Sequence, residues 1–301
     1  MLKLVIPKGS LERATLELFE AADLKVVRGS DREYRGSIDD PRIDSVAVLR
    51  PQEIPTYVED GFFDVGVTGE DWIAETDSKV VHVTPLEYSK QTDLPVKIVL
   101  AVPRDAGITG PGQIRPGSRI STEFPNLTKA YFERLGIPVR VFLSYGATEA
   151  KVPEIVDAIV DLTETGSTLR RHGMEIVDVI LESRTQLIAN SSAYEDPGKR
   201  KAIDELTILL RGAIDARGKV LVKLNVRGQD LDGVVAALPA MKAPTVSQLA
   251  ESGAASAEPQ GERFYAVETI VPKAVINRLI PELKARGAED IVEIAVTKIV
   301  P

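Results

Sequence analysis

The stretch that decides the fold is EIVDAIVDLTETGSTL, residues 154–169, in which an apolar segment leads into a turn rich in hydroxyl side chains and glycine. Residues 155–160 form a mainly β-branched run of the length of a buried parallel strand; it carries Asp157 and is closed by Asp161. A helical turn follows and stops at Gly173. The pattern predicts a strand, a small-residue turn and a helix N-terminus, with Asp161 at the carboxyl end of the strand.

A strand-to-helix turn of this kind can bind phosphate, because backbone N–H groups converge there and the helix N-terminus adds positive potential. The turn has neither a Walker ending nor a G-x-G-x-x-G pattern. Acids before the turn are placed to accept hydrogen bonds from vicinal ribose hydroxyls, Asp161 directly and Asp157 in support. We therefore expect a phosphoribosyl site, with an ordinary βα turn as the alternative. The residues predicted to hold its 5-phosphate are Thr165, Gly166, Ser167 and Thr168.

This stretch resembles the phosphoribosyl pyrophosphate motif of phosphoribosyltransferases, and DAIVDLTETGSTL is similar to the corresponding segment of ATP phosphoribosyltransferases. Other stretches resemble the same family in the same order along nearly the whole chain. They are LVIPKGSL, LRPQEIPTYVEDGFFDVGVTGEDWI, ISTEFPNLTKAYFERLGI, ALPAMKAPTVSQL and RGAEDIVEIAVTKIV. The last two lie in a C-terminal part that is found only in the family's long form.

The resemblance implies an enzyme of histidine biosynthesis that joins N1 of the adenine of ATP to C1 of phosphoribosyl pyrophosphate and releases pyrophosphate. It implies Mg²⁺ bridging pyrophosphate oxygens while keeping several waters, without a set of protein metal ligands. It further implies inhibition by histidine and a cytoplasmic homo-oligomer, a hexamer with a dimer in some states.

The implied fold is α/β, with a two-lobed, periplasmic-binding-protein-like catalytic body and a C-terminal ferredoxin-like (ACT-like) α+β regulatory domain. Residues 1–96 and 184–212 are predicted to form the first catalytic lobe, and residues 97–183 the second lobe with the phosphoribosyl motif. Residues 213–301 are predicted to form the regulatory domain. The element pattern from Lys219 onward reads βαββαβ, which by itself indicates a ferredoxin-like split unit.

Residues at other turns are further candidates for binding. Lys8 and Arg50 end predicted strands and are expected to contact the anionic groups of phosphoribosyl pyrophosphate, together with Glu164 in the central turn. Thr68 and Glu149 are expected near the nucleotide. The alternative for each is a routine or solvated turn residue.

Alignment with the family points to a histidine pocket in the C-terminal domain. The candidates are Asn225, Met241, Thr245 and Asp290. A domain used only for oligomer contacts is the alternative.

Composition limits the remaining function classes. The 301 residues, 44% hydrophobic and 27% charged, suffice for two or three ordinary globular cores. With 0 Cys and 2 His, thiolate sites and a histidine metal cage are excluded. The net charge of -8 argues against nonspecific nucleic-acid binding. No signal peptide or run of transmembrane length is visible, so we expect a cytoplasmic protein without a membrane partner.

Three alternative functions are weighed against the transferase. A solute-binding protein would share the two lobes, but it would usually be exported and has no use for a phosphoribosyl turn. A different phosphoribosyltransferase would share the turn but lack the flanking stretches. A catalytically silent regulatory subunit would keep the fold and lose the turn.

Overall fold

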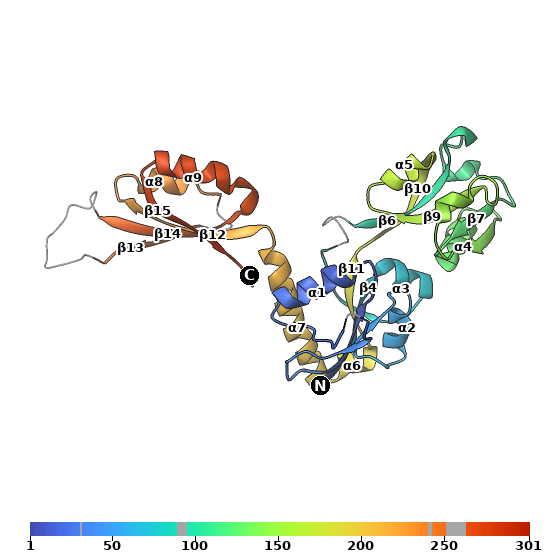
Figure 1. The fold of residues 1–301 in the computed structure, drawn as a ribbon, viewed down its shortest axis with the longest axis horizontal. Coiled ribbons are helices and arrows are strands. Elements are labelled where there is room, and N and C mark those ends of the chain that lie inside the picture. The colour runs from blue at the N-terminus through green and yellow to red at the C-terminus, as the bar shows by residue number, and fades with distance from the viewer. Residues whose placement is uncertain (31, 89–94, 240–242, 251–262) are drawn as a thin grey trace. The chain divides into compact units, whose positions relative to one another are not determined.

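The structure is a computed structural model that describes residues 1–30, 32–88, 95–239, 243–250 and 263–301. The chain divides into two compact units, Met1–Leu210 and Arg211–Pro301, joined within one long helix (Figure 1). Unit 1 contains two sheets and unit 2 contains one.

The first sheet of unit 1 has six strands in the order β2-β3-β1-β4-β11-β5, and we call the part built around it lobe I. Its strand β1 pairs in parallel with β3 and β4, whereas β11 pairs antiparallel with β4 and β5. The carboxyl ends of β1, β3 and β4 therefore meet at one edge of the sheet. The strands are β1 (Leu2–Pro7), β2 (Arg35–Gly36), β3 (Ile43–Leu49), β4 (Val65–Gly69), β5 (Val81–Leu86) and β11 (Thr185–Ala189).

The second sheet has five strands in the order β10-β6-β9-β7-β8 and forms lobe II. Its strand β9 is parallel to β7 and antiparallel to β6. The prediction of a parallel strand is thus correct on one side only. The predicted range, residues 155–160, is also wrong, because the strand is Ala158–Thr163 and Ile155 is 61% exposed. The strands are β6 (Val96–Pro103), β7 (Arg119–Thr122), β8 (Arg140–Leu143), β9 (Ala158–Thr163) and β10 (Met174–Ser183).

Apolar faces hold each lobe together. In lobe II, Ile98, Leu100 and Val160 of the central strands pack with Phe124 and Phe132, and all are almost fully buried. Burial of such side chains contributes roughly 1.5–3 kcal/mol each. The helices of unit 1 are α1 (Glu12–Ala21), α2 (Ile54–Glu59), α3 (Glu70–Thr76), α4 (Pro125–Arg134), α5 (Ser167–Arg171), α6 (Ser191–Glu195) and most of α7 (Pro197–Ala216). Short 3-10 segments are η1 (Arg104–Ala106), η2 (Pro111–Gln113) and η3 (Thr148–Lys151).

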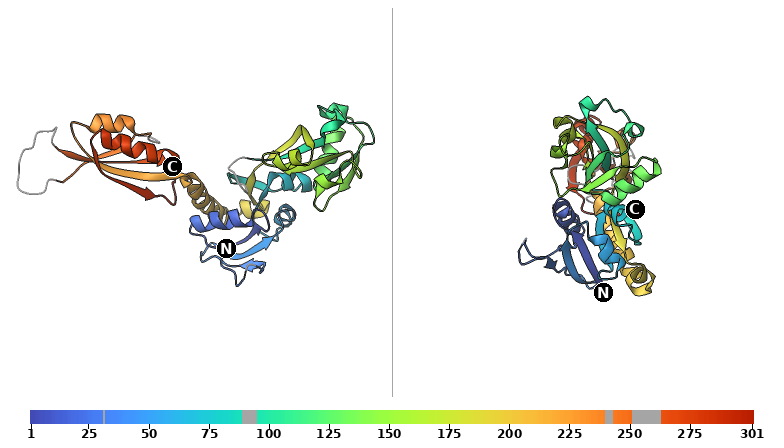
Figure 2. Two further views of the ribbon diagram at one scale, coloured as in Figure 1. Left: turned by 45° about the horizontal axis from the view of Figure 1, so that its top comes forward. Right: turned by 90° about the vertical axis from the view of Figure 1, so that its right-hand side faces the viewer.

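Unit 2 has the predicted βαββαβ order, with antiparallel strands in the order β13-β14-β12-β15. Alternate residues of β12, from Val220 to Val226, are buried under α8 and α9, which lie on the same face of the sheet (Figures 1 and 2). The ferredoxin-like prediction is confirmed. The elements are β12 (Lys219–Arg227), α8 (Leu231–Ala237), β13 (Thr245–Gln248), β14 (Phe264–Pro272), η4 (Lys273–Val275), α9 (Ile276–Ala285) and β15 (Ala288–Ala295).

Across the described ranges, none of the helices is both long enough and apolar enough to cross a bilayer.

Candidate active site

The central turn follows β9 and leads into α5, as the sequence predicts. Gly166 has φ +72°, a left-handed conformation that favours glycine, and its N–H donates to Thr163 Oγ1 at 2.8 Å. Arg170 Nη2 donates to the carbonyl oxygen of Thr165 at 2.8 Å. The turn is therefore closed by its own side chains, and Arg170 adds a positive charge beside it.

The hydroxyl residues of the turn face outward. Thr165, Ser167 and Thr168 are exposed, and Thr165 Oγ1 and Ser167 Oγ form a hydrogen bond of 3.1 Å. The structure thus places the three hydroxyl residues of the predicted phosphate-binding set at one accessible surface, whereas Gly166 is buried. With the first amides of α5 nearby, this surface offers hydrogen-bond donors to an anion.

Asp161 lies in β9, just before this turn, and lines a pocket. Burial raises the pKa of Asp161 to about 6, and the charges of Glu123 and Glu149 act in the same direction. The N–H of Leu162 donates to Asp161 Oδ1 at 2.7 Å and, with the charge of Lys151, acts in the opposite direction. Asp161 is therefore a carboxylate whose charge is poorly solvated and easily lost on mild acidification.

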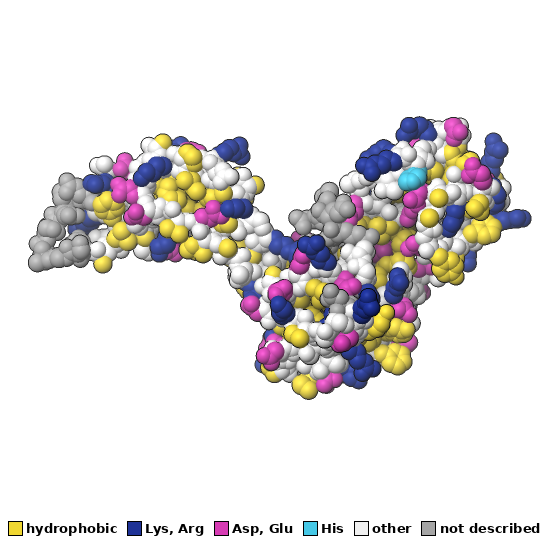
Figure 3. Space-filling view, viewed as in Figure 1, with side chains coloured by type: hydrophobic (Ala, Val, Ile, Leu, Met, Phe, Trp, Pro, Cys, Tyr) yellow, Lys and Arg dark blue, Asp and Glu magenta, His cyan; other side chains and the backbone are white. Residues whose placement is uncertain are grey.

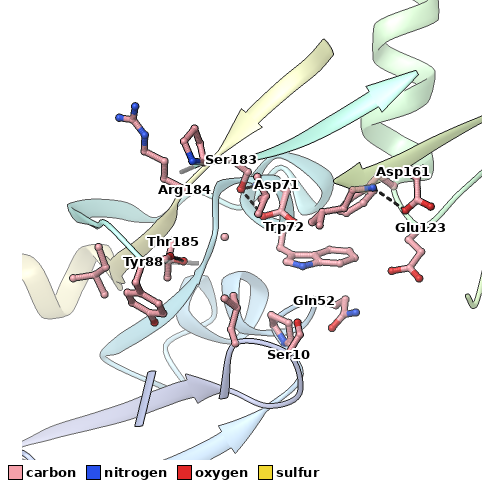
Figure 4. A pocket seen from close by; sticks show the side chains of 18 of the residues that line it. Ser10, Gln52, Asp71, Trp72, Tyr88, Glu123, Asp161, Ser183, Arg184 and Thr185 are labelled. Carbon is pink, nitrogen blue, oxygen red and sulfur yellow. Dashed lines mark hydrogen bonds between the residues drawn. The ribbon is translucent and has the colours of Figure 1, made fainter. Parts of the chain in front are cut away.

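Two of these neighbours were not selected from the sequence. Glu123 directly follows β7, whose carboxyl end lies beside that of β9 because the two strands are parallel. Figure 4 shows Glu123 and Asp161 side by side. The position of Glu123 after a strand is the same signal that singled out Asp161. Lys151 ends η3 and donates to Ser144 Oγ at 2.5 Å. No pattern in the sequence around Lys151 indicates this contact.

The predicted supporting role of Asp157 is not met. Asp157 precedes β9, at the end opposite the turn, and its carboxylate is bound to the backbone N–H and the guanidinium of Arg119 at 2.8 Å each. The guanidinium holds the pKa of Asp157 below its ordinary value. Asp157 therefore fixes the entry of β9 and β7 and is not brought to the ribose position.

Lys8 and Arg50 follow β1 and β3 at the same edge of the lobe I sheet, since Pro7 pairs with Leu49. Arg50 is exposed, and Lys8 Nζ lies 4.0 Å from the centroid of the Tyr34 ring. Figure 3 shows Lys and Arg side chains on both lobes around the hollow that separates them. This edge can attract anions.

The prediction that Thr68 faces the nucleotide is wrong. Its side chain is fully buried, and its Oγ1 donates to the carbonyl oxygen of Pro51 at 3.0 Å. Thr68 therefore shapes the Pro51 turn, which lines the pocket, without reaching the pocket itself. Glu149, in contrast, lies in η3 close enough to affect Asp161 electrostatically.

A cavity of about 280 Å³ lies between the lobes within unit 1. Lobe I contributes Asp71 and Trp72 to its wall, and lobe II contributes Asp161 (Figure 4) and Phe124. The remaining lining residues are Ser10, Leu11, Pro51, Gln52, Gly69, Leu86, Glu87, Tyr88, Pro95, Val96, Glu123, Leu162, Ser183, Arg184 and Thr185. The pocket combines an aromatic wall with carboxylates, as small-molecule sites commonly do.

Two buried acceptor groups near the site have no hydrogen-bond partner among the described residues. They are the carboxylate oxygens of Glu164, in the central turn, and Oε1 of Gln52, whose residue lines the pocket. A buried acceptor without a donor costs roughly 1–3 kcal/mol. Both groups are therefore places where a donor from a ligand, an ion or a water would be favourable.

The carboxylates of the site bear on whether it can hold a divalent cation. Within the described ranges, no group of three or more His, Cys, Asp or Glu side chains is spaced to hold a metal ion. Asp161 and Glu123 nevertheless present carboxylates at the pocket, and carboxylates suit a hydrated Mg²⁺. The residues thus fit an ion that is held mainly by substrate phosphates.

In unit 2, the structure brings two of the predicted histidine-binding residues together. Asn225 Nδ2 donates to Asp290 Oδ2 at 2.9 Å, and Asp290 has φ +48°. Thr245 pairs with Glu268 across β13 and β14, and Glu268 binds Lys223, two residues before Asn225 on the same face of the sheet. Met241 lies outside the described residues.

Two lobes thus enclose a pocket, an acid and a donor-rich turn lie on lobe II, and a ferredoxin-like unit follows in the chain. Residues 50–212 match the family model described as HisG, ATP phosphoribosyltransferase, and residues 216–298 match that of the HisG C-terminal domain.

Full-length relatives agree with these matches. Over 300 residues the chain is 43% identical to the ATP phosphoribosyltransferase of Pelotomaculum thermopropionicum, covering 100% of this chain and 99% of that one. It is 45% identical over 302 residues to that of Desulforudis audaxviator, with the same coverage. The chain therefore belongs to the ATP phosphoribosyltransferase family and is a pentosyltransferase, as the sequence predicted.

A solved structure supports the fold. The ATP phosphoribosyl transferase (HisG:HisZ) complex from Thermotoga maritima matches with a TM-score of 0.62 and 30% identity, covering 71% of this chain and 99% of that chain. The predicted fold class is confirmed.

Proposed function

We propose that this chain catalyses the transfer of a 5-phosphoribosyl group from phosphoribosyl pyrophosphate to N1 of the adenine of ATP, the first step of histidine biosynthesis. The new bond joins C1 of the ribose to N1, and the bond between C1 and the pyrophosphate oxygen breaks with its electron pair on pyrophosphate. The observation that carries the proposal is Asp161 at the pocket wall, immediately before the donor-rich turn.

Phosphoribosyl pyrophosphate is placed along lobe II. Thr165, Gly166, Ser167 and Thr168 hold its 5-phosphate, and Asp161 accepts hydrogen bonds from the ribose hydroxyls. Support comes from the exposed hydroxyls of the turn and from the position of Asp161 two residues before Thr163, which closes the turn. Glu164 stays in this set because its carboxylate oxygens lack donors among the described residues.

ATP is placed against the lobe I wall. The indole of Trp72, backed by the buried ring of Phe124 with the two centroids 4.6 Å apart, gives an apolar surface suited to a purine. Lys8 and Arg50, at the carboxyl edge of the lobe I sheet, would contact the pyrophosphate of phosphoribosyl pyrophosphate. Glu149 remains a proposed neighbour of the nucleotide because it lies near Asp161.

These residues act by positioning and by electrostatics. As C1 loses pyrophosphate, positive charge develops at C1 and at the ring oxygen, and the ionised carboxylates of Asp161 and Glu123 stabilise it. Lys8 and Arg50 stabilise the negative charge of the leaving group. Mg²⁺, when bound through substrate phosphates, supplies further neutralisation of that charge.

We also propose that unit 2 binds histidine and that the protein is a cytoplasmic homo-oligomer, a hexamer with a dimer in some states. Asn225 and Asp290 form a paired amide and carboxylate that suit the charged ends of an amino acid. Thr245 would extend that site across β14. Allosteric inhibition then requires histidine to favour one of two states of the assembly.

One assay tests the transferase proposal against its alternatives. Pyrophosphate release should require ATP and phosphoribosyl pyrophosphate together. A solute-binding protein or a silent regulatory subunit would release none, and a different phosphoribosyltransferase would use another acceptor in place of ATP. Product that forms without ATP would contradict the proposal.

A further inference from the structure

Helix α3 belongs to lobe I, yet two of its side chains, Trp72 and Glu75, contact lobe II. Glu75, near its carboxyl end, is 7% exposed and reaches the first turn of α4. Glu75 Oε1 accepts from the N–H of Asn126 at 3.0 Å, and Oε2 accepts from the N–H of Leu127 at 2.9 Å. Asn126 Nδ2 returns a hydrogen bond to the carbonyl oxygen of Glu75 at 3.1 Å.

This contact replaces a local helix cap. The residue before α4, Phe124, makes no side-chain capping bond within the described structure, and Pro125 has no N–H. The first two amides that α4 can offer are therefore both satisfied by a carboxylate from the other lobe. A negative charge at this position also interacts favourably with the helix dipole.

Two neighbours on α3 extend the contact toward the pocket. Trp72, one turn before Glu75, packs into the hydrophobic core of lobe II and contacts the ring of Phe124. Asp71 is bound to Ser183, the last residue of β10 before the chain returns to lobe I. Trp72, Phe124, Asp71 and Ser183 all line the pocket.

We propose that Glu75 is a positioning residue that joins the two lobes and sets the geometry of the pocket between them. By holding Asn126 and Leu127, it fixes the 123–125 segment that carries Glu123 and Phe124 against Asp161 and Trp72. It contacts neither reacting atoms nor the pocket itself. Its effect on substrates rests on the proposed function, whereas its effect on lobe separation does not.

The distance between the lobes can be measured directly with spin labels, because the chain contains 0 Cys and labels therefore attach only to introduced cysteines. Cysteines placed at the exposed positions Glu59 on α2 and Glu133 on α4 carry one spin label on each lobe. Double electron–electron resonance spectroscopy, recorded without substrate, then gives the distribution of distances between the two spin labels and so between the lobes. We expect Glu75→Ala to broaden that distribution. Glu75→Gln, which keeps one oxygen acceptor but turns an NH₂ group toward the second amide, should give an intermediate width.

Tyr131→Phe is the matched control. Tyr131 lies on the same helix and its hydroxyl donates to Asp178, but both residues belong to lobe II. This variant should lose stability while keeping the parent's distance distribution and its KM values. A merely structural role for Glu75 would make Glu75→Ala behave in the same way.

The kinetic arm uses ATP and phosphoribosyl pyrophosphate. Glu75→Ala should raise the KM values about tenfold, with kcat reduced much less, and Glu75→Gln should recover part of the loss. An unchanged distance distribution, or unchanged KM values in folded Glu75→Ala or Glu75→Gln protein, would overturn the proposal. If even the parent protein fails to use ATP with phosphoribosyl pyrophosphate, the proposed function fails, and the distance measurement alone decides the role of Glu75.

Discussion

Asp71 and Ser183 form a closed, buried pair at the crossing between the lobes. The Ser183 hydroxyl donates to Asp71 Oδ1 at 2.7 Å and accepts from the Asp71 N–H at 3.0 Å. Burial raises the pKa of Asp71, and the Ser183 hydrogen bond acts in the opposite direction. The Ser183 hydrogen bond therefore favours the ionised form of Asp71, which burial opposes.

Ser183→Ala should destabilise the protein by about 1–3 kcal/mol, because it leaves that carboxylate with one donor fewer. The folded-state pKa of Asp71 would rise further above its unfolded value, so the loss is fully present at high pH and shrinks as Asp71 becomes protonated. Urea unfolding over a pH series from about 8 down to about 4 measures how the loss depends on pH. A loss that stays constant over the whole series would show that Asp71 is not the group affected.

Asp161→Asn should weaken the use of phosphoribosyl pyrophosphate about ten- to a hundredfold, because an amide replaces a carboxylate acceptor. The same change should stabilise the folded protein at neutral pH. The pKa raised from 3.8 to about 6 corresponds to a cost of up to about 3 kcal/mol for the buried charge. Steady-state kinetics and thermal unfolding check the two effects together. A folded variant with parent kinetics removes Asp161 from the site.

The same pKa predicts how the activity depends on pH. As pH falls through about 6, Asp161 takes up a proton, and the KM for phosphoribosyl pyrophosphate should rise in the parent protein. Because the folded pKa lies above the unfolded one, the cost of the buried charge applies above about 6 and disappears below 3.8. Asp161→Asn serves as the control. A KM that keeps the same pH step in this variant would assign the titration to another group.

Gly166→Val should abolish most phosphoribosyl pyrophosphate binding. A side chain at φ +72° is strained, and its Cβ would lie 2.9 Å from Arg170 Nη1 and 3.0 Å from Ile176 Cδ1. Gly173→Val is the matched control, since Gly173 has φ +70° and a Cβ there meets nothing within 4 Å. Both variants should lose stability from the backbone strain, roughly 1–2 kcal/mol. Calorimetry should show a binding defect only for Gly166→Val; equal binding by both would exclude the phosphate role of the turn.

L-histidine should inhibit the parent protein, and Thr245→Leu or Asp290→Asn should reduce that inhibition while leaving the uninhibited turnover unchanged. Asparagine suits position 290 because it tolerates the left-handed backbone at φ +48° while removing the charge. Lys273→Gln, which breaks the pair with Glu293 elsewhere in unit 2, should retain sensitivity. Parent protein that neither binds nor responds to millimolar histidine contradicts the sensor proposal.

Much of the fold could be predicted because local patterns decide it. The alternation along β12, the apolar run of β9 and the glycines that follow α2, α4, α5, α7 and α9 are signals contained in short segments. The start of β9 was misplaced because Ile155 is as β-branched as the strand residues, although it is exposed. Because β9 starts later than predicted, Asp157 lies before the strand, at the end opposite the site, and not in the strand's interior.

The part of the candidate site that a single segment forms could be predicted from the sequence. The parts formed where distant segments of the chain meet could not. The turn from Thr163 to Arg170 is local, so its residues were selected together. Thr68 obeyed the same strand-end pattern, but the pattern does not say toward which side of the sheet a side chain points. Glu75 contacts a helix 52 residues away, and nothing in the α3 sequence distinguishes it from a solvated acid.

Strand β11 lies between β4 and β5, although lobe II separates it from both in the sequence. During synthesis, β5 must therefore wait for its sheet partner until all of lobe II has left the ribosome. Lobe II is one uninterrupted segment and can fold first. Strand β11, which follows Ser183 closely, then completes the lobe I sheet, so lobe I can be completed only after lobe II has been synthesised. A chain truncated before Thr185 would expose the edges of β4 and β5 to aggregation.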